Sequence, residues 1–156
     1  MLNWLKALFG NPSPSGPPEM VRRFSAADSP LSRDGITAGP DGWLIDAKKQ
    51  QTFHLFELQN PQVEQCLVAY RAKVKSEGLD GRAFLEMWCR LPGRGEFFSK
   101  GFNRPVKGTT DWASYEIPFF LKKGQRPDLI KLNLVVEGTG KIWIKDIEVQ
   151  KTPLSS

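Results

Sequence analysis

The chain has 156 residues, of which 40% are hydrophobic and 25% charged, with a formal net charge of +5 at pH 7. This is the composition of a soluble globular protein with room for one domain. The basic residues are scattered, and no arginine-rich run occurs, so we expect no nucleic-acid partner. No stretch approaches the ~20 apolar residues of a transmembrane helix. The start of the chain also lacks a signal-peptide pattern. We therefore expect a protein that is cytoplasmic, or peripheral to a membrane complex, unless a longer precursor was processed.

The first ten residues carry a helical pattern. Their apolar side chains, with Trp4 beside them, recur at helical spacing and predict a short amphipathic helix that ends near Gly10. Such a helix is shorter than the ~12–15 residues that an isolated helix needs in water. It therefore either folds back on its own domain or frays, or it docks on a partner subunit or a membrane surface. The docking residues would be Leu2, Trp4, Leu5, Leu8 and Phe9.

Proline and glycine then divide the chain. Residues 11–18 read NPSPSGPP, which neither continues a helix nor joins the interior of a sheet, so residues 1–18 are expected to be a helix and a linker. Residues 19–41 are polar and interrupted by breakers, which predicts an irregular lead-in with at most one short edge strand. A sandwich domain over residues 42–151 and a tail over 152–156 complete the expected organisation.

From residue 42 onward the apolar residues alternate with a period of two, which is typical of strands with one buried face. Strands are expected near residues 42–47, 52–58, 66–75, 82–91, 97–98, 112–119, 130–136 and 142–149. The segments EGLDG and EGTG, at 77–81 and 137–140, are expected to be turns, the second of them a hairpin connection. Many short strands with regular turns and no βαβ rhythm indicate an all-β antiparallel sandwich.

The residues that carry chemistry are few. With only two cysteines and one histidine, the chain is too poor in ligands for a zinc site. Cys66 and Cys89 fall on apolar faces, where reduced core thiols are favoured over a buried disulfide. His54 lies in an expected strand, and no GxSxG or phosphate-binding motif accompanies it. Glu86 and Glu116 are available as a hydrolase pair, but their spacing does not single them out. We therefore expect no enzyme activity.

The outward face of the long central strands is the candidate binding surface. If Leu85, Met87 and Cys89 point inward, their neighbours point away from the core, and we expect side chains of adjacent strands on the same face. The candidate ligand-binding residues are Arg71, Phe84, Glu86, Trp88, Arg90 and Asn133. A tryptophan among polar groups suits a sugar, whose apolar ring face packs on the indole. It equally suits a protein interface, where Trp and Arg are enriched. The plainer alternative is that the N-terminal segment covers Trp88 and Phe84, with Glu86 paired to Arg71 or Arg90.

The remaining aromatic residues have structural explanations. Trp43, Trp112 and Trp143 are expected to be core or sandwich-edge residues. The segment 93–104 carries Phe97, Phe98 and Phe102 among basic residues; it either forms a rim of the binding surface or plugs one end of the sandwich.

Four segments together resemble a known family. They are Tyr70-Arg71-Ala72, Trp112-x-x-Tyr115, Leu132-x-Leu134 and the terminal Gly140-x-Ile142-Trp143-Ile144-Lys145-Asp146-Ile147. Their order over residues 43–151 resembles the galactose-binding-like jelly rolls, particularly carbohydrate-binding modules of the CenC type. The resemblance implies a jelly-roll sandwich and non-catalytic carbohydrate binding on a concave sheet face. The alternative function is that of an accessory subunit, which docks on a larger assembly through the N-terminal helix and the same face.

Domains of this family often hold a structural calcium ion. The terminal strand of the family carries two aspartates, of which only Asp146 is present here, because Lys145 stands at the other position. An ammonium group beside the site opposes calcium, which needs six to eight oxygen ligands. We therefore expect no cofactor, with Asp146 as the one remaining candidate ligand.

Overall fold

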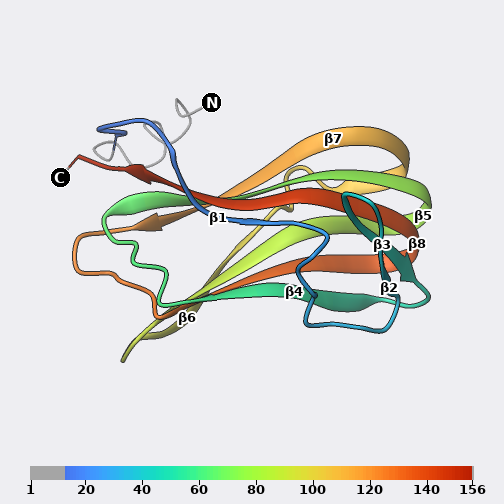
Figure 1. Ribbon diagram of the computed structural model, residues 1–156, viewed down its shortest axis with the longest axis horizontal. Coiled ribbons are helices and arrows are strands. Elements are labelled where there is room, and N and C mark those ends of the chain that lie inside the picture. The colour runs from blue at the N-terminus through green and yellow to red at the C-terminus, as the bar shows by residue number, and fades with distance from the viewer. Residues whose placement is uncertain (1–12, 156) are drawn as a thin grey trace.

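The computed structural model describes residues 13–155, which form eight β-strands and no helix (Figure 1). The strands are β1 (Glu19–Phe24), β2 (Ile36–Ala38), β3 (Gly42–Ala47), β4 (Gln51–Gln59), β5 (Cys66–Leu91), β6 (Gly95–Lys100), β7 (Val106–Leu121) and β8 (Leu129–Pro153). Because these residues contain no helix, none of them forms a helical membrane span. The helix expected over residues 1–10 lies outside the described residues.

Two unusually long strands, β5 and β8, organise the fold. They pair antiparallel from Cys66↔Pro153 to Arg90↔Leu129, with register shifts between Arg71 and Lys73 and between Glu77 and Asp80. β7 and β6 follow the other edge of β5, and β1, β3 and β4 follow the other edge of β8. The whole sheet bends over at one end of the molecule, where β5, β7 and β8 curve back (Figure 1). Its two halves thus become the layers of an antiparallel jelly-roll sandwich.

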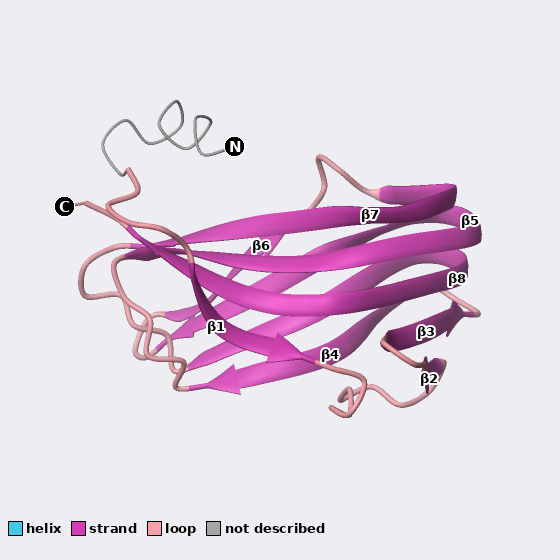
Figure 2. Cartoon of the chain, turned by 45° about the horizontal axis from the view of Figure 1, so that its top comes forward, coloured by secondary structure: helices cyan, strands magenta, loops and turns pink. Residues whose placement is uncertain are grey.

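We name the layers after their edge strands. The β7 layer contains β7, the first half of β5, the second half of β8, and β1. The β6 layer contains β6, the second half of β5, the first half of β8, and β4. β3 pairs with β8 next to the bend, and β2 pairs with β3 (Figure 2). The two outer faces therefore carry side chains from the same long strands.

The expected turns at 77–81 and 137–140 are wrong, because both segments are bends within continuous strands. Gly81 lies opposite Gly138, with φ of 103° and 154°. A Cβ atom on Gly138 would lie only 1.7 Å from the carbonyl oxygen of Asp80. These positions therefore require glycine, but they mark the place where two paired strands bend together rather than a turn at which one strand ends.

The lead-in contributes more structure than expected. β1 extends the β7 layer by pairing with β8 from Glu19↔Lys151 to Phe24↔Ile147. Pro14 forms an isolated bridge with Leu154 beyond it. With β2 also present, residues 19–41 provide two strands rather than an irregular segment, because their polar side chains lie at edges of the sheet where only one face needs apolar residues.

The core consists of the alternating apolar residues of both layers, as the period of two predicts. Val68, Tyr70 and Val74 point into it from one half of β5, and Leu85, Met87 and Cys89 from the other half; all are buried. The Tyr70 hydroxyl donates a hydrogen bond of 3.2 Å to the carbonyl oxygen of Asn133 in the opposite layer. Trp43 is buried too, as expected, whereas Trp112 and Trp143 lie half-buried on the outer face of the β7 layer.

Both cysteines are buried free thiols, which confirms the favoured prediction. Burial raises the pKa of Cys66 to about 11 and that of Cys89 to about 12. Removal of the thiols from water disfavours the charged thiolate, so neither sulfur is an activated nucleophile.

Candidate functional site

Four strands of the β6 layer place one polar side chain each in a single cross-strand row. This polar row consists of His54 on β4, Asn133 on β8, Glu86 on β5 and Lys100 on β6. His54 Nδ1 lies 3.2 Å from Asn133 Oδ1, and Asn133 Nδ2 donates to Glu86 Oε1 at 2.8 Å. Lys100 Nζ lies 3.4 Å from Glu86 Oε2. Each oxygen of the central carboxylate therefore has its own partner.

An aromatic pair lies on each side of the polar row. Phe84 packs against Phe102 with ring centroids 4.8 Å apart, and Trp88 packs against Phe98 at 5.2 Å. Phe84 and Trp88 flank Glu86 on the same face of β5, so their Cα atoms are separated by roughly 13 Å at the usual rise of a strand. A single pyranose ring cannot bridge that distance, whereas a short oligosaccharide can.

The centre of this face is sheltered and its rim is exposed. Phe84, Glu86 and Asn133 are 2%, 6% and 3% exposed, whereas Phe98 and Phe102 are 53% and 48% exposed. A ligand would therefore meet the rim, where the rings and the ends of His54 and Lys100 are accessible. The buried residues hold those groups in position. Burial of such polar side chains requires that they be hydrogen-bonded, as they are here.

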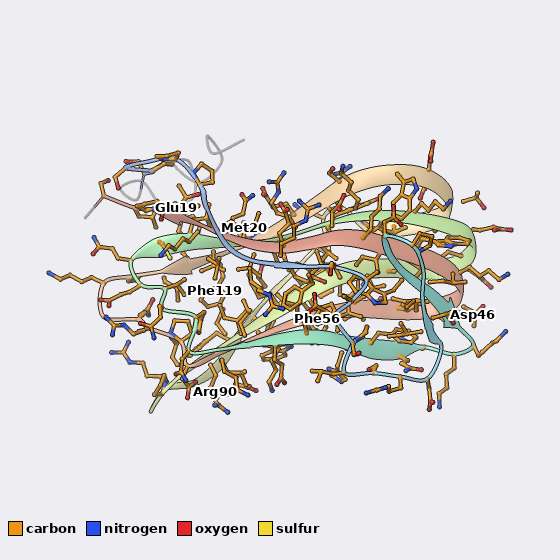
Figure 3. All side chains as sticks on the ribbon, in the orientation of Figure 1. Glu19, Met20, Asp46, Phe56, Arg90 and Phe119 are labelled. Carbon is orange, nitrogen blue, oxygen red and sulfur yellow. The ribbon has the colours of Figure 1, made fainter. Side chains whose placement is uncertain are left out.

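Of the six residues expected to bind ligand, four are brought together: Phe84, Glu86, Trp88 and Asn133. Arg90 shares their strand but lies at its end, away from the bend, on the opposite side of the molecule from Asp46 (Figure 3). Its guanidinium donates to both carboxylate oxygens of Asp128, at 2.9 and 3.1 Å. The same pair lowers the pKa of Asp128 and raises that of Arg90.

The placement of Arg71 on this face is wrong. The bend after residue 76 puts the first half of β5 in the β7 layer, so Arg71 projects from the opposite outer face. There its Nε atom lies 3.1 Å from Glu116, and Nη1 lies 3.7 Å from Glu148. The expected pairing of Glu86 with Arg71 or Arg90 is also wrong, since Lys100 and Asn133 are the partners of Glu86. Glu86 and Glu116 also lie in different layers and face no common cleft.

Sequence reasoning missed two members of the polar row. His54 and Lys100 come from the strands that flank the central pair, and only the cross-strand register places them beside Asn133 and Glu86. Phe98 and Phe102 could be recognised as rim candidates from their position in a basic aromatic segment. The described N-terminal residues do not supply the cover proposed for Phe84; Phe102 and the guanidinium of Arg82 do.

Asp146 has the wrong surroundings for a calcium ligand. It occupies a bulge of β8 with φ 51°. Its Oδ1 atom lies 2.8 Å from Arg23 Nη2, and its Oδ2 atom lies 3.5 Å from Lys73 Nζ. Within residues 13–155 no group of three or more acidic, His or Cys side chains could hold a metal ion. The positive charges of Arg23 and Lys73 at this carboxylate oppose the binding of a calcium ion, so these residues do not fit calcium.

The comparisons with known proteins concern the fold. No protein-family model and no curated protein sequence matches the chain. Among solved structures, the CBM22-1 xylan-binding domain of Paenibacillus barcinonensis Xyn10C aligns with 11% identity and a TM-score of 0.58, over 88% of this chain and 97% of that one. The CBM22-1 and GH10 modules of Clostridium thermocellum Xyn10B, complexed with xylohexaose, align with 11% identity and a TM-score of 0.57, over 85% of this chain and 28% of that one.

A further similar structure is a Family 16 Carbohydrate Binding Module-2, with 11% identity and a TM-score of 0.51 over 71% of this chain and 77% of that one. At such low identity the likeness concerns the fold alone. It confirms the fold that the sequence resemblance implied: the chain is an antiparallel jelly-roll β-sandwich of the kind that carbohydrate-binding modules adopt.

Proposed function

We propose that this chain is a non-catalytic carbohydrate-binding module. Its ligand would be an oligosaccharide or polysaccharide chain that lies along β5 on the outer face of the β6 layer. The observation that carries the proposal is the polar row between two aromatic pairs. Similar structures described as xylan-binding, or complexed with xylohexaose, support a β-linked glycan as the first ligand to test.

The aromatic residues of the site would pack on the sugar rings, and its polar residues would form hydrogen bonds with the sugar hydroxyls. Trp88 and Phe98 at one end, and Phe102 at the other, offer ring faces on which the C–H faces of pyranose rings pack. Between them, the Lys100 ammonium and the His54 imidazole would bond to sugar hydroxyls. Glu86 and Asn133 fix the directions of both groups, which lowers the entropy lost when a flexible chain binds.

The same geometry explains why we propose binding without catalysis. A glycoside hydrolase needs two carboxyl groups on either side of one bond. Glu86 is the only carboxylate in the polar row, and both of its oxygens are already engaged. Glu116 is paired with Arg71 on the opposite face. His54 has Asn133 as its partner rather than a nucleophile.

A glycan array tests the proposal, with Trp88→Ala as the site variant. Trp112→Ala is the matched control, because Trp112 is also half-buried but lies on the outer face of the other layer. We expect wild type and Trp112→Ala to bind the same sugars and Trp88→Ala to lose binding at least tenfold, as a central aromatic contact does. Unchanged circular dichroism must accompany the loss. Binding that survives Trp88→Ala but fails in Trp112→Ala would move the site to the other face.

The alternative is a protein partner on the same face. It is favoured by two exposed phenylalanines, Phe98 on β6 and Phe102 on the loop that follows it, with exposures of 53% and 48%. An array without any bound sugar, together with capture of one stoichiometric protein that Trp88→Ala no longer captures, would establish this alternative. The docking role of residues 1–10, on a partner or a membrane surface, lies outside the described residues and stays a proposal.

A further inference from the structure

A groove of about 750 Å³ adjoins the candidate site on the side of β7. Lys100 and Phe102 line it and also belong to the site, because Lys100 contacts Glu86 and Phe102 packs on Phe84. The loop between β6 and β7 forms one wall; Figure 2 shows it leaving the sheet where β6 ends and rejoining where β7 begins. The opposite wall is formed by β7 and the first half of β5. The groove thus runs around the β7 edge of the sandwich, and a ligand that contacts Lys100 and Phe102 at the rim of the site also contacts the groove.

Arg104, on the loop wall, is the unusual residue of the groove. Its guanidinium is held by two neighbours: it donates to the carbonyl oxygen of Ser114, and its Cζ atom lies 4.5 Å from the centroid of the Tyr115 ring. Within residues 13–155 it has no carboxylate within ion-pair distance, although it is exposed. A guanidinium that is held in place but lacks an anion is suited to bind one, since its planar fork matches a carboxylate.

The charges that line the groove lead to the same conclusion. Its one carboxylate, Glu116, lies 3.1 Å from Arg71 and is thereby neutralised. The charge of Lys100 is balanced by Glu86, its partner in the polar row. Arg104 therefore remains as an unbalanced positive charge. The rest of the lining includes apolar groups such as Ala69 and Pro118, against which a sugar ring can pack.

We propose that the groove binds a carboxylate-bearing branch of the polysaccharide whose backbone lies on the β6 layer, with Arg104 pairing with the branch carboxylate. This inference rests on the proposed function and refines it, because it names the ligand as an acidic, branched polysaccharide. A neutral branch would leave Arg104 without its partner and would gain only the packing contacts.

Two forms of one polymer test the inference: glucuronoxylan, and the same glucuronoxylan after chemical reduction of its carboxylates to alcohols. Affinities would be measured by isothermal titration at low and physiological salt. We expect wild type to bind the acidic form about fivefold more tightly, the magnitude of an exposed charge pair, with the difference shrinking as salt rises. Arg104→Ala and Arg104→Glu should remove this preference while leaving affinity for the reduced polymer unchanged.

Arg94→Ala is the matched control, because Arg94 is an exposed arginine in the turn between β5 and β6, outside the groove, and makes no ion pair within the described residues. It should keep the preference. Equal affinity of wild type for both polymers, or a preference that survives Arg104→Glu, overturns the inference while binding itself upholds the proposed function. Failure to bind either polymer overturns the inference, and the proposed function then stands or falls on the glycan array. Melting temperatures within about 2 °C of wild type would show that the Arg104 variants remain folded.

Discussion

The double bend of β5 and β8 gives the sharpest test of the fold, through Gly138→Ala. Gly138 has φ 154°, and an added Cβ atom would lie 1.7 Å from the Asp80 carbonyl oxygen. That oxygen belongs to the paired strand, so relief requires opening the ladder at the bend. We expect a loss of about 3–5 kcal/mol, the range of changes that break a special backbone position. For a domain of this size that corresponds to a fall in melting temperature of roughly 10 °C or more.

Gly78→Ala provides the control within the same bend. Gly78 also has positive φ, at 59°, but an added Cβ atom would meet nothing within 4 Å. The left-handed conformation costs alanine about 1–2 kcal/mol, and the reduced entropy of the unfolded chain offsets part of it, so about 1 kcal/mol remains. Thermal unfolding followed by tryptophan fluorescence compares the two. Our account of the bend is refuted if Gly138→Ala melts within 3 °C of Gly78→Ala.

Three further measurements address the thiols, the ion pairs and the metal. Burial raises the pKa of Cys66 to about 11 and that of Cys89 to about 12, so neither thiol should react with a disulfide reagent at pH 8 until denaturant is added. Rapid labelling of the native protein would contradict this. Because the thiols of the unfolded chain ionise at lower pH than the buried ones, the stability of the fold should decline as the pH rises above about 9. Because Arg90 lowers the pKa of Asp128, that pair stabilises the fold at neutral pH and loses its effect as the carboxyl is protonated. Asp128→Asn should lower the melting temperature slightly at pH 7, and this difference should begin to shrink below about pH 4 and disappear as the pH falls through the lowered pKa of Asp128; a difference that does not change with pH would contradict this. Calcium at millimolar concentration should leave the melting temperature unchanged from that in chelator, whereas a rise would mean that Arg23 and Lys73 release Asp146 to a metal ion.

The sequence predicts the core well because a strand's period of two depends only on local order. Each buried residue of β5 from Ala83 to Leu91 is found on the expected face. What the period cannot reveal is which strands continue through a glycine. At 77–81 and 137–140 the same glycine signal is compatible with a turn that ends a strand or with a bend that carries it into the other layer. The choice depends on long-range pairing.

That choice decided which site residues could be predicted. Phe84, Glu86 and Trp88 are successive outward residues of one strand segment, so their common face follows from local alternation. Arg71 lies on the same strand but before the bend, and the local pattern therefore assigned it to the wrong layer. His54 and Lys100 depend entirely on register with neighbouring strands, which no local pattern contains.

The two outer faces provide an internal comparison, because β5 and β8 contribute to both. On the β7 layer the charged groups pair off across the sheet in one continuous chain: Glu116, Arg71, Glu148, Arg23, Asp146 and Lys73. Such surface pairs contribute little stability each, but they leave few charges unsatisfied. On the β6 layer a carboxylate and an amide are instead buried between rings, which costs desolvation that an ordinary solvated face does not incur.

If the polar row exists for a ligand rather than for the fold, replacing it should separate stability from binding. Asn133→Leu alone removes the donor from the buried Glu86 carboxylate and should cost about 1–3 kcal/mol. Adding Glu86→Met removes the orphaned charge, so the double variant should recover to wild-type stability or above it, as apolar replacements of buried polar pairs often do. Glycan affinity should fall in Asn133→Leu, where His54 loses its partner, and should be lost in the double variant, where Lys100 loses its partner as well. A double variant less stable than Asn133→Leu would mean that the row holds the sandwich together, and retained affinity would mean that the ligand does not need it.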